Sequence, residues 1–465
     1  MSKPLVSPGV VRPLPPAGPT SNVSAPVSPT PVSPVPAAKP TAAPLDAVAQ
    51  AGAPGAVVLS APNAAGEVRP SAASTGSLFG GAVVEPRGLP AASTEHLGEM
   101  LRYGASPANG YAALALGLLG DQASADSIKN VVRYGASPAN GLAALALGLM
   151  GDRSACESID NVVHYGVSPA NGYASIALAL LGNQASSDAI KNVVRFGAAP
   201  ANGLAALALG LMGDRSSSEV IENVVRFGAT PMNGLAAIGL ALLGDPGAST
   251  VIENVVRYGA KPANGLASIA LGLLGNPASS GVLSDVVRYG ASPSNGLAAI
   301  GLALLKAPGS SEVIENVVRY GTSPANGLAA IGLAIQGDPG ASKVIENVVR
   351  YGASPANGFA SIALGLQGDP GSADVLENVV RYGAKPANGL ASLGLALLGN
   401  PASAGVLDNV ARYGASPSNG LAAVGLALLG SQGKTVAETQ RGPIDAKAVV
   451  LAALLLPEFA STDGA

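Results

Sequence analysis

The feature that most constrains this chain is a repeat of fixed length. The aromatic residue in a phrase close to VVRYG recurs every 31 residues, from Tyr103 to Tyr413. In every copy a Pro follows four positions later, and an Asn follows two positions after that Pro. Eleven copies without an insertion indicate a tandem array built from one structural unit.

Residues 230–260 illustrate the structure that is predicted for one repeat. Thr230 followed by Pro231 is typical of a helix start, with a hydroxyl N-cap and Pro at the first helical position. The run from Leu235 to Leu243 is rich in Leu, Ala and Ile and favours a helix. Gly244 is expected to end that helix as the residue after the C-cap.

A second helix is predicted from about Ser249 to Tyr258. Val251 and Val255 lie one turn apart and, with their neighbours, give this helix an amphipathic face. In another copy Ser216 and Glu219 have the spacing of a capping box. Each repeat is therefore predicted to be a helical hairpin.

The predicted fold class is all-α: a right- or left-handed α-solenoid of about ten 31-residue helical hairpins, preceded by a disordered leader rich in Pro, Ser and Ala. At roughly 8–10 Å between adjacent helices, such an array gives a rod or superhelix about 90–100 Å long. A β-solenoid is the alternative, because Gly is abundant and Leu alternates with Ala. The Pro residues at the predicted helix starts and the Gly residues at the predicted helix ends favour helices.

The domain boundaries follow from changes in composition. Residues 1–88 form the leader, 89–103 an N-terminal capping helix, 104–430 the repeats, and 431–465 a C-terminal cap helix and tail. Residues 93–103 resemble a lone second helix, and residues 444–456 (IDAKAVVLAALLL) are predicted as the closing cap. Terminal repeats of an open solenoid need such covers.

Of the 37 prolines, 18 lie before residue 91, and no acidic residue appears before Asp46. The leader has no apolar segment of the kind that forms a Sec signal. It looks like the secretion leader of bacterial type III effectors, and a Pro-rich linker is the other interpretation. The first interpretation predicts secretion by a non-Sec route into a host cell, and the second leaves the protein cytoplasmic.

Composition argues against catalysis. The chain has one Cys, two His, 12% charged residues and a net charge of -3. One Cys excludes a disulfide framework and any multi-Cys metal site. Cys156 has only His164 as a conceivable acid–base partner, eight residues away, and nothing supports a dyad. We predict no catalytic, cofactor-binding or metal-binding residue, and therefore a protein that is not an enzyme.

Two recurrent positions are candidates for partner binding. An Arg precedes the aromatic in most repeats and forms a ladder of cations, which either binds a partner or pairs with a Glu four residues earlier. The connection between the two helices varies between repeats, through neutral drift or as a specificity code. The candidates are Arg133, Arg195, Arg226, Arg257, Arg288, Arg319, Arg350, Arg381, Asp121, Asp152, Asn183 and Asp214.

The other recurrent residues have structural interpretations. The aromatics are predicted as core wedges, the Asn after each Pro as a group that satisfies open helix amides, and the following Gly as a point of close backbone approach. Gly234, Ala237 and Ala241 form a stripe of small residues on the first helix. That stripe either packs against the next first helix, lines an apolar groove for a partner, or contacts a membrane surface; the apolar run is too short to span a bilayer.

The layout resembles the TAL effectors, a type III effector family whose helical hairpins open with Thr-Pro and read DNA bases through the inter-helix loop. The resemblance rests on openings such as Ser106-Pro107 and Thr230-Pro231 and on the near-identity of the copies. The 31-residue period is shorter than that family's, the loop lacks its paired Gly, and no nuclear-localisation cluster is evident. No base-reading residue is carried over.

These observations predict a non-enzymatic scaffold, delivered as a bacterial effector, that binds a protein along its repeat surface. One alternative is a nucleic-acid-binding protein that uses the Arg ladder and the loops, with DNA as the partner. Another is a self-assembling structural protein that associates through the small-residue stripes.

Overall fold

The computed structural model describes residues 89–228, 231–245, 247–431, 435–439 and 442–445. The chain divides into two units, Met1–Ala53 and Pro54–Ala465, and all described residues belong to the second. The predicted leader, residues 1–88, lies outside the described residues, as do residues 446–456 of the predicted C-terminal cap helix.

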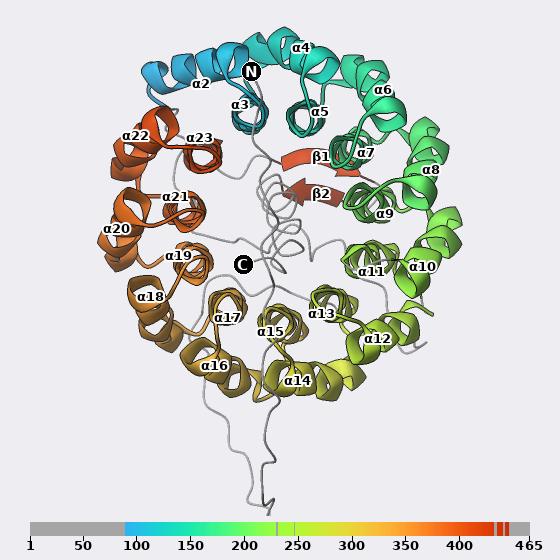
Figure 1. Cartoon of the computed structure of the whole chain (residues 1–465), viewed down its shortest axis with the longest axis vertical. Coiled ribbons are helices and arrows are strands. Elements are labelled where there is room, and N and C mark those ends of the chain that lie inside the picture. The colour runs from blue at the N-terminus through green and yellow to red at the C-terminus, as the bar shows by residue number, and fades with distance from the viewer. Residues whose placement is uncertain (1–88, 229–230, 246, 432–434, 440–441, 446–465) are drawn as a thin grey trace, which may run out of the picture. The chain divides into compact units, whose positions relative to one another are not determined.

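The repeats are helical hairpins, and the prediction of an all-α solenoid is confirmed. The first helix of each hairpin lies in an inner layer and the second in an outer layer (Figure 1). The inner helices are α3 (Ala108–Leu119), α5 (Ala139–Met150), α7 (Ala170–Leu180), α9 (Ala201–Met212), α11 (Met232–Leu243), α13 (Ala263–Leu274), α15 (Ser294–Leu305), α17 (Ala325–Gln336), α19 (Ala356–Gln367), α21 (Ala387–Leu397) and α23 (Ser418–Ser431).

The outer helices carry the stripe of Val and Ile residues that packs onto the inner layer. They are α2 (Ala91–Tyr103), α4 (Ala125–Tyr134), α6 (Cys156–Tyr165), α8 (Ser187–Phe196), α10 (Ser218–Phe227), α12 (Ala248–Tyr258), α14 (Ser280–Tyr289), α16 (Ser310–Tyr320), α18 (Ser342–Tyr351), α20 (Ala373–Tyr382) and α22 (Ala404–Tyr413).

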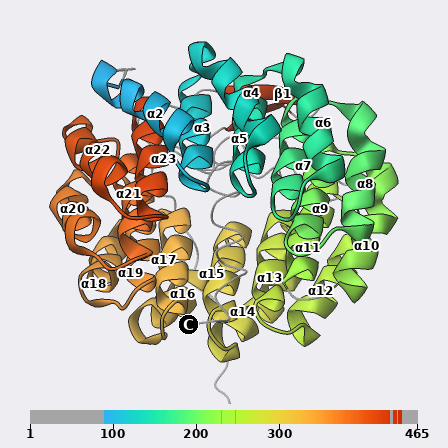
Figure 2. The ribbon, with the colours of Figure 1, turned by 45° about the horizontal axis from the view of Figure 1, so that its top comes forward.

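The array closes on itself. The last inner helix, α23, packs against the first, α3, much as neighbouring inner helices pack elsewhere. In the outer layer, Nη2 of Arg412 on α22 donates a hydrogen bond to the carbonyl oxygen of Ala92 on α2 at 3.0 Å. The described part of the second unit is therefore a ring one hairpin tall (Figures 1 and 2), and the expected open rod was wrong.

The predicted N-terminal cap is a lone second helix, as expected, but it does not cover an open end. As α2 it completes the outer layer, between α4 and α22 (Figure 1). At the other end of the array, Ile444 and Asp445 belong to a strand instead of beginning the predicted cap helix.

Glycine allows the inner helices to approach one another closely. A Cβ added at Gly141 would lie 2.5 Å from the Cα of Ala170 on the next inner helix, and one at Gly210 would lie 2.4 Å from the carbonyl oxygen of Gly239. The stripe of Ala237 and Ala241 is fully buried between neighbours, at 0% and 1% exposure. Of the three interpretations of this stripe, close packing is confirmed, so self-assembly through an exposed stripe was wrong.

The helix ends agree with the predictions in part. Gly244 ends α11 in the left-handed conformation, with φ of 66°. Pro231 lies at the N-cap position, one residue earlier than expected, and no side chain caps the helix. Where the residue before that Pro is Ser, as at Ser168, its hydroxyl instead bonds the carbonyl oxygen of Ala199 one repeat on, at 2.8 Å.

The predicted capping box is wrong, because Ser216 lies in a short 3₁₀ helix before α10 begins. Its hydroxyl donates to Asp214 at 2.6 Å. Such 3₁₀ helices precede many outer helices: η1 (Gln122–Ser124), η2 (Arg153–Ala155), η3 (Gln184–Ser186), η4 (Arg215–Ser217), η5 (Pro277–Ser279), η6 (Pro339–Ala341), η7 (Pro370–Ser372) and η8 (Pro401–Ser403).

Two strands follow the ring, β1 (Thr435–Thr439) and β2 (Gly442–Asp445), and they pair antiparallel. Strand β1 lies next to the inner helices α5 and α7 (Figure 1). None of the described helices has both the length and the apolar character that crossing a bilayer requires.

The glycine contact between inner helices makes a first prediction. We expect Gly141→Ala to lower the free energy of unfolding by about 1–3 kcal/mol, because the new methyl group meets the backbone of Ala170. The matched control is Gly281→Ala on α14, where nothing lies within 4 Å and helix propensity favours Ala by up to about 1 kcal/mol. Urea unfolding followed by circular dichroism measures both, and equal midpoints would contradict the close-packing account.

Candidate binding site along the aromatic edge

One edge of the ring is defined by the ends of the outer helices. Each outer helix ends with a cation, or His164, followed by an aromatic residue, and the inner helix then begins after a short turn. We call the aromatic residues on this side the aromatic edge. They are Tyr103, Tyr134, Tyr165, Phe196, Phe227, Tyr258, Tyr289, Tyr320, Tyr351, Tyr382 and Tyr413.

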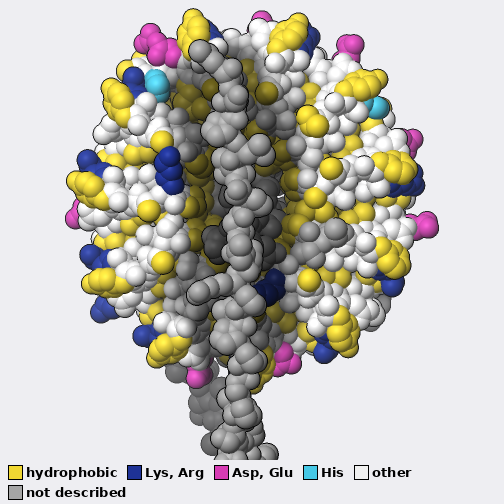
Figure 3. Space-filling view, in the orientation of Figure 1, with side chains coloured by type: hydrophobic (Ala, Val, Ile, Leu, Met, Phe, Trp, Pro, Cys, Tyr) yellow, Lys and Arg dark blue, Asp and Glu magenta, His cyan; other side chains and the backbone are white. Residues whose placement is uncertain are grey.

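The aromatic edge is exposed, so the prediction that these residues are core wedges was wrong. Their exposed fractions lie between 80% and 85%. The buried stripe of α4 consists of Ile128, Val131 and Val132, and Tyr134 follows as the last residue of the helix. At that end the aromatic ring projects beyond the core (Figure 3 shows hydrophobic side chains next to Lys and Arg around the perimeter).

The Gly after each aromatic fixes where the outer helix ends. The N–H of Gly135 donates to the carbonyl oxygen of Val131 at 2.8 Å. A Cβ at Gly135 would lie 2.4 Å from that same oxygen, so a larger residue does not fit. Because this turn recurs, every aromatic residue is presented at the same height on the ring.

Many of the Arg residues beside the aromatic edge form ion pairs within their own helix. Arg257 contacts Glu253 at 2.6 Å, four residues earlier. The same pairing occurs for Arg226 with Glu222, Arg319 with Glu315, Arg350 with Glu346 and Arg381 with Glu377. The structural interpretation of the ladder is therefore confirmed at these positions.

Other cations of the ladder lack that partner. Lys191 and Ser284 stand where the pairing Glu would be, and among the described residues Arg195 and Arg288 form no ion pair. Nε of Arg133 donates to Ser158 on the next outer helix at 3.1 Å. Among the described residues, the guanidinium groups of Arg195 and Arg288 therefore have no carboxylate opposite them.

Grooves separate consecutive outer helices along this edge. The groove between α14 and α16 has a volume of about 770 Å³ and is lined by Arg288, Tyr289, Asn295, Asn316 and Tyr320, among others. Grooves of about 380 Å³ lie between α16 and α18 and between α8 and α10, and both present the Arg, an aromatic residue and the two Asn at equivalent positions.

The two Asn series have different roles. Asn140 accepts a hydrogen bond from the N–H of Gly141 at 3.0 Å, which confirms at this position that the first series satisfies an open amide at the helix start. The equivalent Oδ1 atoms of Asn109, Asn171 and Asn357 have no hydrogen-bond partner among the described residues. In the second series Asn223, Asn316 and Asn347 are exposed, and none has a hydrogen bond to another described residue. These amides offer both donors and an acceptor to a ligand in the groove.

The candidate residues in the loops lie on the opposite edge, where the inner helices end. Asp121 accepts a hydrogen bond from the N–H of Ala123 at 3.1 Å, and Asp152 accepts one from Ser154 at 3.0 Å. Asn183 instead donates to the hydroxyl of Ser186 at 3.1 Å. The structure thus divides the predicted candidates between two edges, and the loop residues organise their own turns.

Asp214 is the most heavily bonded of these loop residues. Burial by itself raises the pKa of a carboxyl, but hydrogen bonds from Ser187, Ser216, Ser217 and Lys191 outweigh it and hold the pKa of Asp214 well below its usual range. Because Ser187 and Lys191 belong to the preceding repeat, this carboxylate links two hairpins.

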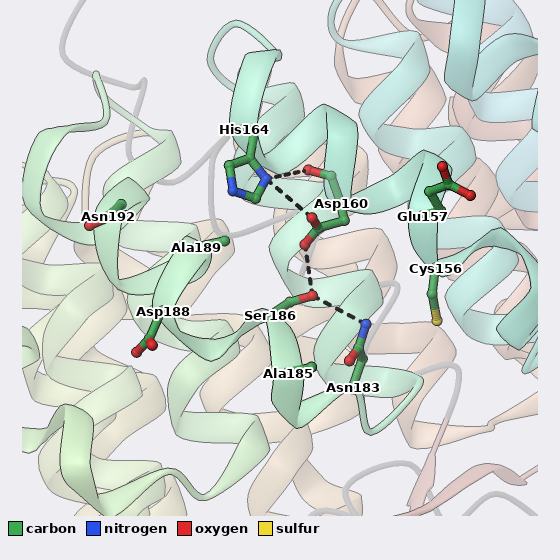
Figure 4. A pocket seen from close by; sticks show the side chains of 10 residues that line it. All are labelled: Cys156, Glu157, Asp160, His164, Asn183, Ala185, Ser186, Asp188, Ala189 and Asn192. Carbon is green, nitrogen blue, oxygen red and sulfur yellow. Dashed lines mark hydrogen bonds and ion pairs between the residues drawn. The ribbon is translucent and has the colours of Figure 1, made fainter.

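One further cavity, of about 490 Å³, lies between α6 and α8 (Figure 4). Nδ1 of His164 lies 3.2 Å from Asp160, and the hydroxyl of Ser186 donates to the same carboxylate at 2.7 Å. Asn183 in turn donates to Ser186. Sequence reasoning missed this cluster, although the replacement of Arg and Glu by His164 and Asp160 in one repeat marks it.

The geometry of this cavity does not make a nucleophile. Ser186 donates its proton to Asp160 and not to the imidazole of His164. Cys156 points away from His164 (Figure 4), and burial raises the pKa of its thiol, which disfavours the reactive thiolate. The described residues contain no cluster of His, Cys, Asp and Glu that could hold a metal ion.

Comparison with known proteins gives no family. No protein-family model matches the chain, and no curated protein matches it. Among solved structures, the complex of CpcE and CpcF of phycocyanin lyase from Nostoc sp. PCC7120 is similar, with 19% identity, a TM-score of 0.35, and coverage of 52% of this chain and 94% of that chain.

Human deoxyhypusine hydroxylase in complex with glycerol is also similar, with 14% identity, a TM-score of 0.32, and coverage of 54% of this chain and 98% of that chain. At these TM-scores neither resemblance carries an argument about what this chain binds or catalyses.

The hydrogen bonds to Asp214 predict how the stability of the fold depends on pH. Since the folded-state pKa is lowered, the carboxylate stabilises the fold above the unfolded pKa of about 3.9, and this contribution is lost as the pH falls through the folded value. We expect Asp214→Asn to reduce the free energy of unfolding by about 1–3 kcal/mol at pH 7. The difference from wild type should shrink below about pH 4.

Asp188→Asn is the control, because the Asp188 side chain is 95% exposed and should affect stability little. Thermal unfolding between pH 7 and pH 3 measures the loss of stability in both variants. A loss in Asp214→Asn that stays constant across this range would show that the carboxylate charge is not what stabilises the turn.

Proposed function

We propose that this protein is a non-enzymatic repeat scaffold that binds an extended stretch of a partner protein along its aromatic edge. The observation that carries the proposal is the row of aromatic side chains, each 80–85% exposed and each beside a cation or His164. Tyr and Arg are enriched at protein interfaces and dominate their binding energy. The fold does not need these rings, because they are not part of the core.

The repetition of the groove supports an extended polypeptide. Helices in packing contact are roughly 8–10 Å apart, the outer helices of the ring are spaced more widely than the inner ones, and an extended chain advances about 3.3 Å per residue, so about three or more residues of a partner would span one repeat. The exposed amides of Asn316 and Asn347 suit the main-chain N–H and C=O groups that recur along such a chain. The aromatic rings would contact the side chains.

The charges favour a partner with scattered acidic groups. Arg195 and Arg288 lack ion pairs among the described residues, so a partner carboxylate there would meet an uncompensated guanidinium group. Along the rest of the edge, Glu residues neutralise several Arg residues. A nucleic-acid backbone needs a continuous row of free cations, so we do not propose DNA as the partner.

A direct test removes part of the aromatic edge. We expect the full-length chain to capture a partner protein from host-cell lysate, and Tyr289→Ser with Tyr320→Ser to weaken that complex at least about tenfold, as the loss of interface hot spots does. Gln122→Ser on the opposite edge is the control and should bind as wild type does.

The Arg residues provide an internal comparison in the same titration. Arg288→Ala should weaken binding more than Arg319→Ala, because Arg319 is already paired with Glu315. If the partner binds the aromatic double variant with wild-type affinity, the aromatic edge is not the binding surface.

The proposal includes delivery of the scaffold into a host cell as a secreted effector. It is supported by the Pro- and Ser-rich composition of the leader and by the lack of acidic residues before Asp46. We expect residues 1–50 fused to a reporter enzyme to be translocated by cells with an intact type III apparatus and not by an apparatus mutant. The same reporter fused to residues 54–88 is the control, and retention of the first fusion would reject delivery while leaving the scaffold proposal standing.

A further inference from the structure

The inner wall of the ring is apolar. On α11, Leu240 faces the outer layer and is 1% exposed, and Gly234 contacts the next inner helix. Gly239 contacts the preceding inner helix, at Ala206. Ile238, two residues before Leu240, lies on the opposite side of α11 and therefore faces the centre of the ring.

This apolar character is repeated around the ring. Every described inner helix has Leu, Ile or Val at the position equivalent to Ile238 and Leu or Ile four residues later. Figure 3 shows hydrophobic side chains on both sides of the centre of the molecule. Soluble proteins rarely leave a contiguous apolar surface of this extent to water. Ile238 and its equivalents are accordingly only 0–8% exposed.

The chain itself supplies a matching segment. After β2 ends at Asp445, residues 448–456 read AVVLAALLL, with no charged or polar side chain. Strand β2 pairs with β1, and β1 lies next to the inner helices α5 and α7, so the segment begins a few residues after a two-stranded unit that contacts the inner layer. The closure of α23 onto α3 leaves no open end of the array for this segment to cover.

We propose that residues 448–456 pack against the apolar inner wall of their own ring. Nine residues in a helix are about 14 Å long, close to the roughly 18 Å of a twelve-residue inner helix. The leader is a poorer match, because its Pro, Ser and Thr residues carry few large apolar groups. Burial of the segment would remove apolar surface of both partners from water.

The chain contains no Trp, so one introduced Trp reports this contact without background. In the full-length protein we expect Leu455→Trp to emit at shorter wavelength than the control Ser461→Trp and to be quenched several-fold less by iodide. Adding Ile269→Gln and Ile300→Gln to the inner wall should shift the Leu455→Trp emission towards that of the control. Circular dichroism checks that the wall variant stays folded.

Three outcomes would overturn the proposal. The Trp at position 455 could be as exposed as the one at position 461, or its emission could stay unchanged in a wall variant that remains folded. The shift could also depend on protein concentration, with light scattering showing dimers, which would place the segment in a second copy. A variant that loses its helical signal is replaced by Ile269→Ser alone, and the same emission criterion then applies.

Discussion

The contact between neighbouring inner helices is the interaction on which the rest of the structure depends. Where Gly141 faces Ala170, the backbones approach so closely that one methyl group has no room. Neighbouring outer helices, which carry Val, Ile and long polar side chains, contact each other far less than the inner helices do. The small residues inside and the larger ones outside make each hairpin a wedge, and eleven equal wedges close a ring.

Ring closure changes what the two ends of the array require. In an open solenoid the first and last helices expose apolar faces that need covers. Here those faces cover each other, and Arg412 ties the two ends of the outer layer together. The apolar run near the C-terminus therefore needs another explanation, and the inner wall of the ring provides a surface of matching chemistry.

The charged and aromatic residues show where local reasoning from sequence succeeds and where it fails. The pairing of Arg257 with Glu253 follows from their spacing within one helix, and the structure confirms it. The aromatic residues were misplaced, because a fixed phase in every repeat suits a core position and a surface position equally well. Only the end of the helix at Tyr258, beyond the stripe of Val255 and Val256, decides that its ring is 82% exposed.

The sequence by itself determined the repeat, its two helices, the glycines that end the inner helices and the ion pairs within the outer helices, because each depends on residues close together in the chain. Only the tertiary structure decided that the array closes, that aromatic residues and loop carboxylates occupy opposite edges, and that the inner wall is apolar. Closure depends on the angle between hairpins. That angle comes from packing across the inner layer. A small difference in the angle at each repeat adds up around the array and decides whether a ring or a superhelix forms.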